Sequence, residues 1–104
     1  MRRERIYPIS YIAMVLQYLR WRREKYGNTS KCFTYEGIMN WAKRTAEYAD
    51  LERTTVERVI RRLAEEKFLI RVRERPKALF CINEQRIREY LERMQLPIDH
   101  EWWE

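Results

Sequence analysis

The apolar residues of this chain recur at helical spacing in four segments and alternate with polar residues in one. A period near 3.6 predicts a helix, and a period of 2 predicts a strand. The pattern predicts helices over 10–27, 35–50, 54–67 and 84–96, a short strand at 32–34, and a hairpin over 68–83. We expect a mainly α fold with a small antiparallel β-sheet.

The first helix carries two apolar stripes where one would suffice for a single core. Ser10 is a suitable N-cap, and Gly27 is a suitable residue just past the C-terminus. The inner stripe is Ile12, Val15, Leu16 and Leu19, and the second stripe is Tyr11, Met14, Tyr18 and Trp21. The last helix presents a similar apolar face, formed by Ile87, Tyr90, Leu91 and Met94. These two surfaces either form the interface of a homodimer, which we favour, or pack against each other within one chain.

The third helix has the clearest start signal. Thr54 followed by Glu57 reads as a capping box, and the apolar face after it is Val56, Val59, Ile60 and Leu63. In the hairpin, Ile70 and Val72 alternate with arginines, and the tip at 74–77 is basic. Asn83 should cap the last helix, which Pro97 ends.

Length and composition indicate one domain. The chain has 104 residues, of which 45% are hydrophobic and 13% aromatic, so one core can form, and we assign it to residues 1–96. Residues 97–104 form an acidic, aromatic tail. No apolar run reaches the roughly twenty residues that span a bilayer, and no signal peptide is recognisable at the N-terminus. We therefore expect an intracellular, cytoplasmic protein without a membrane partner.

Basic residues are concentrated in two segments. The formal net charge is +6, from 22 Lys and Arg against 16 Asp and Glu, and the sequence pI is near 9.6. Residues 1–26 carry seven basic and two acidic side chains, and residues 51–83 carry nine and five, whereas residues 84–104 carry three and six. The excess suggests a polyanionic partner, although a charge-rich surface can also serve solubility or reflect the composition of thermophiles.

The stretch from residue 51 to 70 contains a distinctive set of residues: Leu51, Thr55-Val56, Arg58, Arg61-Arg62-Leu63 and Leu69-Ile70. With these residues, the order of elements resembles that of winged helix-turn-helix DNA-binding regulators of the small archaeal or archaeal-virus type. The chain departs from the family at Asp50 and Lys67, where glycine is usual, and the stretch from Trp41 to Leu51 is a few residues longer. The resemblance implies a winged helix with an additional C-terminal helix, residues 54–67 being the recognition helix. In a viral protein the location would be the host cell.

This resemblance, together with the helix face opposite the core, predicts a double-stranded DNA interface. A helix fits the major groove, and arginine reads guanine with two hydrogen bonds. The expected contacts are Arg53, Thr54, Thr55, Arg58, Arg61 and Arg62 on the recognition helix, Arg73, Arg75 and Lys77 on the wing, and Lys43 and Arg44 on the second helix. Of these, we place Thr55, Arg58 and Arg62 nearest the bases. The alternative is an ordinary solvated amphipathic helix.

Cys32 and Cys81 fall in segments that lie side by side in this fold, so a cross-strand disulfide is feasible, although an intracellular chain favours two buried thiols. We expect no metal site, because only His100 could join them, and no cofactor. We also expect no enzyme, because the chain lacks a phosphate-binding loop and any paired base and nucleophile. Trp102 and Trp103 in the tail could dock on a protein partner or fold back on Tyr18 and Trp21. The rival function is a winged helix used for protein interaction; RNA binding ranks third.

Overall fold

The structure, a computed structural model, describes residues 8–93. In this part of the chain, four helices accompany one three-stranded antiparallel sheet. The helices are α1 (Pro8–Tyr26), α2 (Tyr35–Lys43), α3 (Arg53–Glu65) and α4 (Glu84–Arg93), and the strands are β1 (Cys32–Thr34), β2 (Leu69–Arg73) and β3 (Leu79–Ile82). The protein is thus mainly helical with a small antiparallel sheet, as the pattern predicts, and this layout is compatible with a winged helix.

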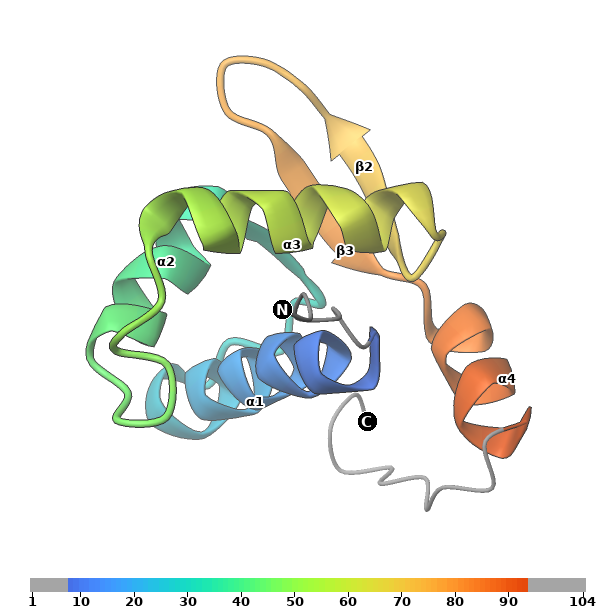
Figure 1. Cartoon of the computed structure of the whole chain (residues 1–104), viewed down its shortest axis with the longest axis horizontal. Coiled ribbons are helices and arrows are strands. Elements are labelled where there is room, and N and C mark those ends of the chain that lie inside the picture. Colours follow the sequence, from blue (N-terminus) through green and yellow to red (C-terminus); the bar gives the residue numbers. More distant parts are fainter. Residues whose placement is uncertain (1–7, 94–104) are drawn as a thin grey trace, which may run out of the picture.

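The core lies between α1 and α3, with α2 at one end and α4 at the other (Figure 1). Val15 of α1, Ile38 of α2, and Val59 of α3 are at most 1% exposed, and Phe33 and Phe80 of the sheet complete the same cluster. Each such side chain contributes about 1.5–3 kcal/mol by leaving water. The hairpin formed by β2 and β3 projects beyond α3 (Figure 1).

Helix α1 begins two residues earlier than predicted, at Pro8, so Ser10 lies within its first turn and is not the N-cap. Proline suits a first helical position because its fixed φ matches the helix and the missing N–H has no partner there. The predicted end is confirmed. Gly27 adopts a left-handed φ of 70°, and its N–H donates to the Arg23 carbonyl at 2.9 Å.

Helix α2 begins at Tyr35 as predicted, where the Thr34 side chain accepts a hydrogen bond from the Gly37 N–H at 3.2 Å. It ends at Lys43 and not near Asp50. The Thr45 hydroxyl donates to the Trp41 carbonyl at 2.8 Å, an oxygen that a continuing helix would use for its own ladder. The chain then reaches α3 through turns.

Helix α3 begins at Arg53, with Glu52 at the N-cap position and no side-chain cap. The predicted capping box is therefore wrong: Thr54 lies inside the first turn, and Glu57 pairs with Arg53. At the other end, the N–H of Phe68 donates to the Leu63 carbonyl at 2.9 Å and that of Lys67 to the Ala64 carbonyl at 3.1 Å. These bonds form a Schellman motif, with Lys67 at a φ of 73° in the position where glycine is common.

The sheet has the strand order β1-β3-β2, so β2 is an edge strand. Cys32 pairs with Cys81 and Phe33 with Phe80, which confirms that the first and last strands are neighbours. Ile70 and Val72 of β2 are 47% and 53% exposed. This part of the hairpin thus extends past the core, and the side chains of Ile70 and Val72 meet solvent, whereas Leu69 and Phe80 are buried.

Helix α4 is capped as predicted: the Asn83 side-chain oxygen accepts from the Arg86 N–H at 3.3 Å. The predicted last turn at 94–96, the tail at 97–104 and residues 1–7 lie outside the described residues. Within 8–93, no helix is long and apolar enough to cross a membrane.

Candidate nucleic-acid interface

The outer face of α3 is built by the same periodicity that buries its inner face. Val56, Val59, Ile60 and Leu63 are at most 2% exposed. On the opposite side Thr54, Arg58 and Arg61 follow one another at spacings of four and three residues, and all three are exposed. Neither Arg58 nor Arg61 has an ion pair or hydrogen bond with any residue in the described part of the chain. Two unpaired guanidinium groups therefore stand at the centre of this face.

The arginines beside them are paired with carboxylates of the same helix. The Arg53 Nε lies 3.5 Å from Glu57 Oε2, and the Arg62 Nε lies 3.8 Å from Glu66 Oε2. Both arginine side chains are more than half exposed. Exposed pairs of this kind contribute between 0 and about 1 kcal/mol, so another anion can displace the carboxylate at little cost. Thr55 is half-buried and lies at the edge of the outer face.

The wing adds four cations with different partners: Arg71, Arg73, Arg75 and Lys77. Arg73 donates from Nε to the Lys77 carbonyl at 3.2 Å, a bond that closes the hairpin. Arg71, which was not among the expected contacts, lies over the Phe80 ring at 5.1 Å and near Glu74 at 3.8 Å. Arg75, at the tip, is exposed and makes no ion pair or hydrogen bond within residues 8–93.

A small cleft of about 180 Å³ separates the start of α3 from the wing. Lys77 donates from Nζ to Glu36 Oε1 at 3.0 Å across one side of it. This hydrogen bond, and then the Lys77 charge, lower the pKa of Glu36, and Arg53 lowers it further. The cleft holds the carboxylates of Glu36 and Glu57 as well as two cations. The carboxylates balance the cations, so this cleft is not by itself an anion-binding site. The Lys77–Glu36 hydrogen bond connects the wing to α2.

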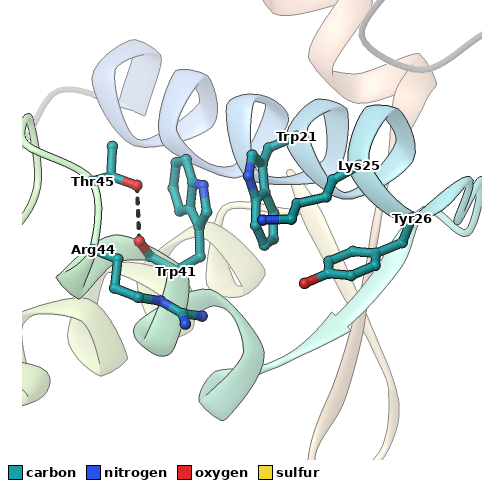
Figure 2. A pocket seen from close by; sticks show the side chains of 6 residues that line it. All are labelled: Trp21, Lys25, Tyr26, Trp41, Arg44 and Thr45. Carbon is teal, nitrogen blue, oxygen red and sulfur yellow. Dashed lines mark hydrogen bonds between the residues drawn. The ribbon is translucent and has the colours of Figure 1, made fainter.

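The two basic residues predicted on the second helix lie in different surroundings. Lys43 is the last residue of α2 and is exposed. Arg44 follows the helix and lines a second, larger cleft together with Trp21, Lys25 and Tyr26 (Figure 2). Arg44 therefore lines the cleft at the end of α1 and not the cleft beside α3.

The second apolar stripe of α1 belongs to the core of its own chain. Met14 and Tyr18 are 0% and 5% exposed, and Tyr18 packs on the rings of Phe33 and Trp41. Of the remaining residues expected at a dimer interface, Ile87 and Leu91 are buried, Tyr11, Trp21 and Tyr90 are partly buried against the core, and Met94 lies outside the described residues. Packing within one chain therefore accounts for the apolar spacing that we interpreted as a dimer surface.

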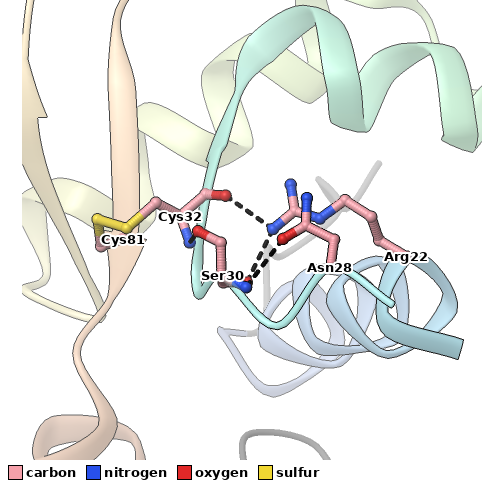
Figure 3. Close-up of a disulfide and its surroundings, with 5 residues drawn as sticks. All are labelled: Arg22, Asn28, Ser30, Cys32 and Cys81. Atoms are coloured by element: carbon pink, nitrogen blue, oxygen red, sulfur yellow. Dashed lines mark hydrogen bonds between the residues drawn. A yellow bond between two sulfur atoms is a disulfide. The ribbon is translucent and has the colours of Figure 1, made fainter. Parts of the chain in front are cut away.

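Cys32 and Cys81 form a disulfide between β1 and β3 (Figure 3). The preference for two buried thiols is therefore wrong: both residues are half-buried, and the antiparallel register places them directly opposite each other. Arg22 of α1 donates to the carbonyl oxygens of Ser30 and Cys32 at 2.8 and 2.9 Å, which fixes the loop before β1 (Figure 3). The disulfide and this arginine fasten β1 to both the wing strand and α1.

The cleft at the end of α1 was missed by the sequence reasoning. The sequence contains two pairs of lining residues, Trp21 with Lys25 and Trp41 with Thr45. The members of each pair are four residues apart, a spacing that places side chains on the same face of a helix. That the two pairs face each other depends on the packing of α1 against α2.

Comparisons with protein-family models, with curated proteins and with solved structures find no match to this chain. The functional inference therefore depends on geometry and chemistry alone.

Proposed function

We propose that this protein binds double-stranded DNA in a sequence-dependent manner, as a transcriptional regulator, with α3 in the major groove and the wing on the flanking backbone or minor groove. The observation that carries the proposal is the pair of unpaired, exposed arginines, Arg58 and Arg61, on the outer face of α3. An α-helix fits the major groove, and a guanidinium group can donate two hydrogen bonds to guanine O6 and N7.

The charges around these two arginines support a sequence-dependent mode. Residues 53–77 hold nine basic and four acidic side chains. The excess of cations attracts phosphates, whereas Glu57 and Glu65 on α3 and Glu66 just after it reduce the general attraction of the helix for any duplex. Binding should thus depend on the base contacts of Arg58 and Arg61 more than on bulk charge. Arg53, Arg75 and Lys77 are assigned to phosphates. Arg62, which the sequence placed near the bases, is now assigned to a phosphate as well, because its guanidinium lies 3.8 Å from the Glu66 carboxylate.

The test is a selection from random duplexes, followed by fluorescence anisotropy with the selected site. The Arg58→Glu, Arg61→Glu double variant should bind this site at least about 100-fold more weakly, because each bidentate contact is worth about 1–3 kcal/mol. Arg93→Glu, which reverses an exposed charge on α4, is the matched control and should bind almost normally. Unchanged binding by the double variant, with a circular dichroism spectrum that shows an intact fold, would contradict the proposal.

A salt titration separates base reading from charge. Each phosphate interaction that a substitution removes should make the slope of log K against log salt less steep by about 0.9. Arg75→Gln at the wing tip should change this slope but not the selected sequence, whereas Arg58→Ala should relax the base preference at one position. If every substitution weakens all duplexes equally, the protein is a non-specific binder.

A protein-interaction function is the second candidate, and the edge strand β2 favours it. Ile70 and Val72 are about half exposed, and the outer edge of β2 has no neighbouring strand among the described residues. Such an edge can add a strand from a partner. This function predicts partner binding that survives Arg58→Glu and is lost on Ile70→Lys.

A cytoplasmic location forms part of the proposal, since a DNA-binding regulator acts inside the cell. A disulfide is rare there in most organisms but common in intracellular proteins of hyperthermophiles. Thiol titration of the protein purified from its native host under alkylating conditions would test this.

A further inference from the structure

A cleft of about 500 Å³ lies between the end of α1 and the end of α2 (Figure 2). Its lining consists of Trp21, Lys25, Tyr26, Trp41, Arg44 and Thr45. This volume falls within the range of sites that hold a small organic molecule, about 300–1,000 Å³. The α3 surface described above does not contribute to it.

Aromatic rings form the walls of this cleft. The rings of Trp21 and Tyr26 meet edge to face, with their centroids 5.6 Å apart, and Tyr26 is 66% exposed. Trp41 forms the floor and is held from behind by Tyr18 and Tyr48. Figure 2 shows the Tyr26 hydroxyl pointing into the space between α1 and α2. These rings offer flat, partly open faces on which a planar group can stack.

The charge of the cleft is positive. Lys25 Nζ lies 5.8 Å from the ring centroids of both Trp21 and Tyr26, and the Arg44 guanidinium extends toward the same space (Figure 2). Neither cation has an ion pair with any residue that the structure describes, and no carboxylate within 8–93 lines the cleft. An aromatic cage without cations would suit a quaternary ammonium ligand. Here the two cations repel such a ligand and attract an anion.

The indole N–H groups of Trp21 and Trp41 add unused donors. Neither forms a hydrogen bond within the described part of the chain, and neither nitrogen is among the buried unpaired atoms, so both N–H groups are open to solvent or a ligand. With the Tyr26 hydroxyl, the cleft combines stacking faces, neutral donors and two cations on rigid helix ends. This combination matches a ligand that is flat at one end and negatively charged at the other.

We propose that this cleft binds a small planar aromatic anion, the ring stacking on an open face of the Trp21–Tyr26 pair and the anionic group accepting from Lys25 and Arg44. Two sources share this chemistry, a nucleoside monophosphate and an aromatic carboxylate. The inference stands independently of DNA binding, because none of the α3 or wing residues takes part.

The test uses the full chain and four probes in calorimetric titrations: AMP, adenosine, indole-3-acetate and tryptamine. Binding of AMP but not adenosine identifies the phosphate source, and binding of indole-3-acetate but not tryptamine identifies the carboxylate source. The indole N–H signals of Trp21 and Trp41 should shift in the NMR spectrum as the bound probe saturates the site. No binding of either anion up to about 10 mM, or binding of adenosine and tryptamine as tight as that of the two anions, would overturn the proposal.

Substitutions locate the site. Lys25→Gln with Arg44→Gln should weaken binding of the anion at least about tenfold, and Tyr26→Ala should weaken it by a similar factor because a stacking face is removed. All three residues are exposed, so these changes should leave the fold intact. Arg93→Gln on α4 is the matched control. Binding that is unaffected by both variants would also overturn the proposal, because the ligand would then lie elsewhere.

Discussion

Removing the disulfide is expected to cost this protein a large share of its stability. Cys32 and Cys81 are 49 residues apart in sequence, so their bond closes a loop that contains α2, α3 and β2. The perturbation is either reduction of the native protein or the Cys32→Ser, Cys81→Ser double variant. Because the next pair in the register, Phe33 and Phe80, is buried with ring centroids 6.1 Å apart, the register should survive without the bond.

The magnitude follows from the length of the closed loop. In the chain-entropy treatment, a cross-link over 49 residues removes about 14 cal/mol/K from the unfolded ensemble, which is about 4 kcal/mol at 25 °C. Domains of this size unfold with about 5–15 kcal/mol. Each kcal/mol shifts the Tm by about 4–8 °C, so reduction should lower the Tm by roughly 15–30 °C.

The assay is thermal and urea unfolding, followed by circular dichroism with and without reductant. The double serine variant should match the reduced protein and be insensitive to reductant. The urea m-value should rise on reduction, since an unfolded chain without the cross-link exposes more surface. Titration of free thiols in the unreduced protein provides a control and should find none from this pair.

Two results would refute this reasoning. If the unreduced protein titrates with two free thiols, the disulfide is not formed. If it titrates with none and reduction lowers the Tm by less than about 5 °C, the loop-closure estimate is wrong, and β1 is held by other contacts such as Arg22.

Four further predictions concern caps and charges. Lys67→Gly should raise the free energy of unfolding by about 1 kcal/mol, because Lys67 has a left-handed backbone that glycine adopts without strain. Thermal unfolding should detect this gain, and Lys67→Ala, which keeps the strain, should not produce it. Asn83→Ala should lower the free energy of unfolding by about 1 kcal/mol or more, because it removes both the cap on the Arg86 N–H and the Nδ2 donation to the Lys67 carbonyl at 2.9 Å. Asn83→Ser also loses the Lys67 bond but keeps a capping oxygen, so it should lose less; equal losses in urea unfolding would contradict the cap. Lys77→Gln should raise the pKa of Glu36 toward its ordinary value, measured by NMR titration of the carboxyl carbon, and no change would exclude their hydrogen bond. Because the folded pKa is lowered, the stabilisation from this pair is present at neutral pH and is lost as the pH falls through that pKa. Under the proposed function, Glu36→Gln should free Lys77 for phosphate, tighten DNA binding and steepen the salt dependence by up to about 0.9; weaker binding would contradict that role.

Much of the fold could be predicted because its signals are local. The spacing of Val56, Val59, Ile60 and Leu63 predicts both the existence of α3 and its buried face. The change to alternation after Phe68 predicts the hairpin, and Asn83 predicts the start of α4. Each of these depends on residues within one or two turns of each other, so a single sequence contains the whole signal.

Boundaries and pairings were less predictable because they depend on competing partners. Thr54 and Glu57 have capping-box spacing, but Glu57 pairs with Arg53 and the helix begins one residue earlier. Helix α2 stops at Lys43, where the N–H groups of Arg44 and Thr45 bond to carbonyls three residues back and leave the helical ladder, and the Thr45 hydroxyl competes for the Trp41 carbonyl. The sequence contains both alternatives in each case, and small differences in energy decide between them.

By itself, the sequence determined the order and type of the elements, the exposure of Arg58 and Arg61, and the basic character of α3 and the wing. Only the tertiary structure decided that the second stripe of α1 is core, that Cys32 and Cys81 are bonded, and that Trp21, Lys25 and Arg44 meet in one cleft. The physical reason is range. Periodicity and caps act over a few residues, whereas burial, cross-strand register and the meeting of two helix ends depend on which distant segments pack together.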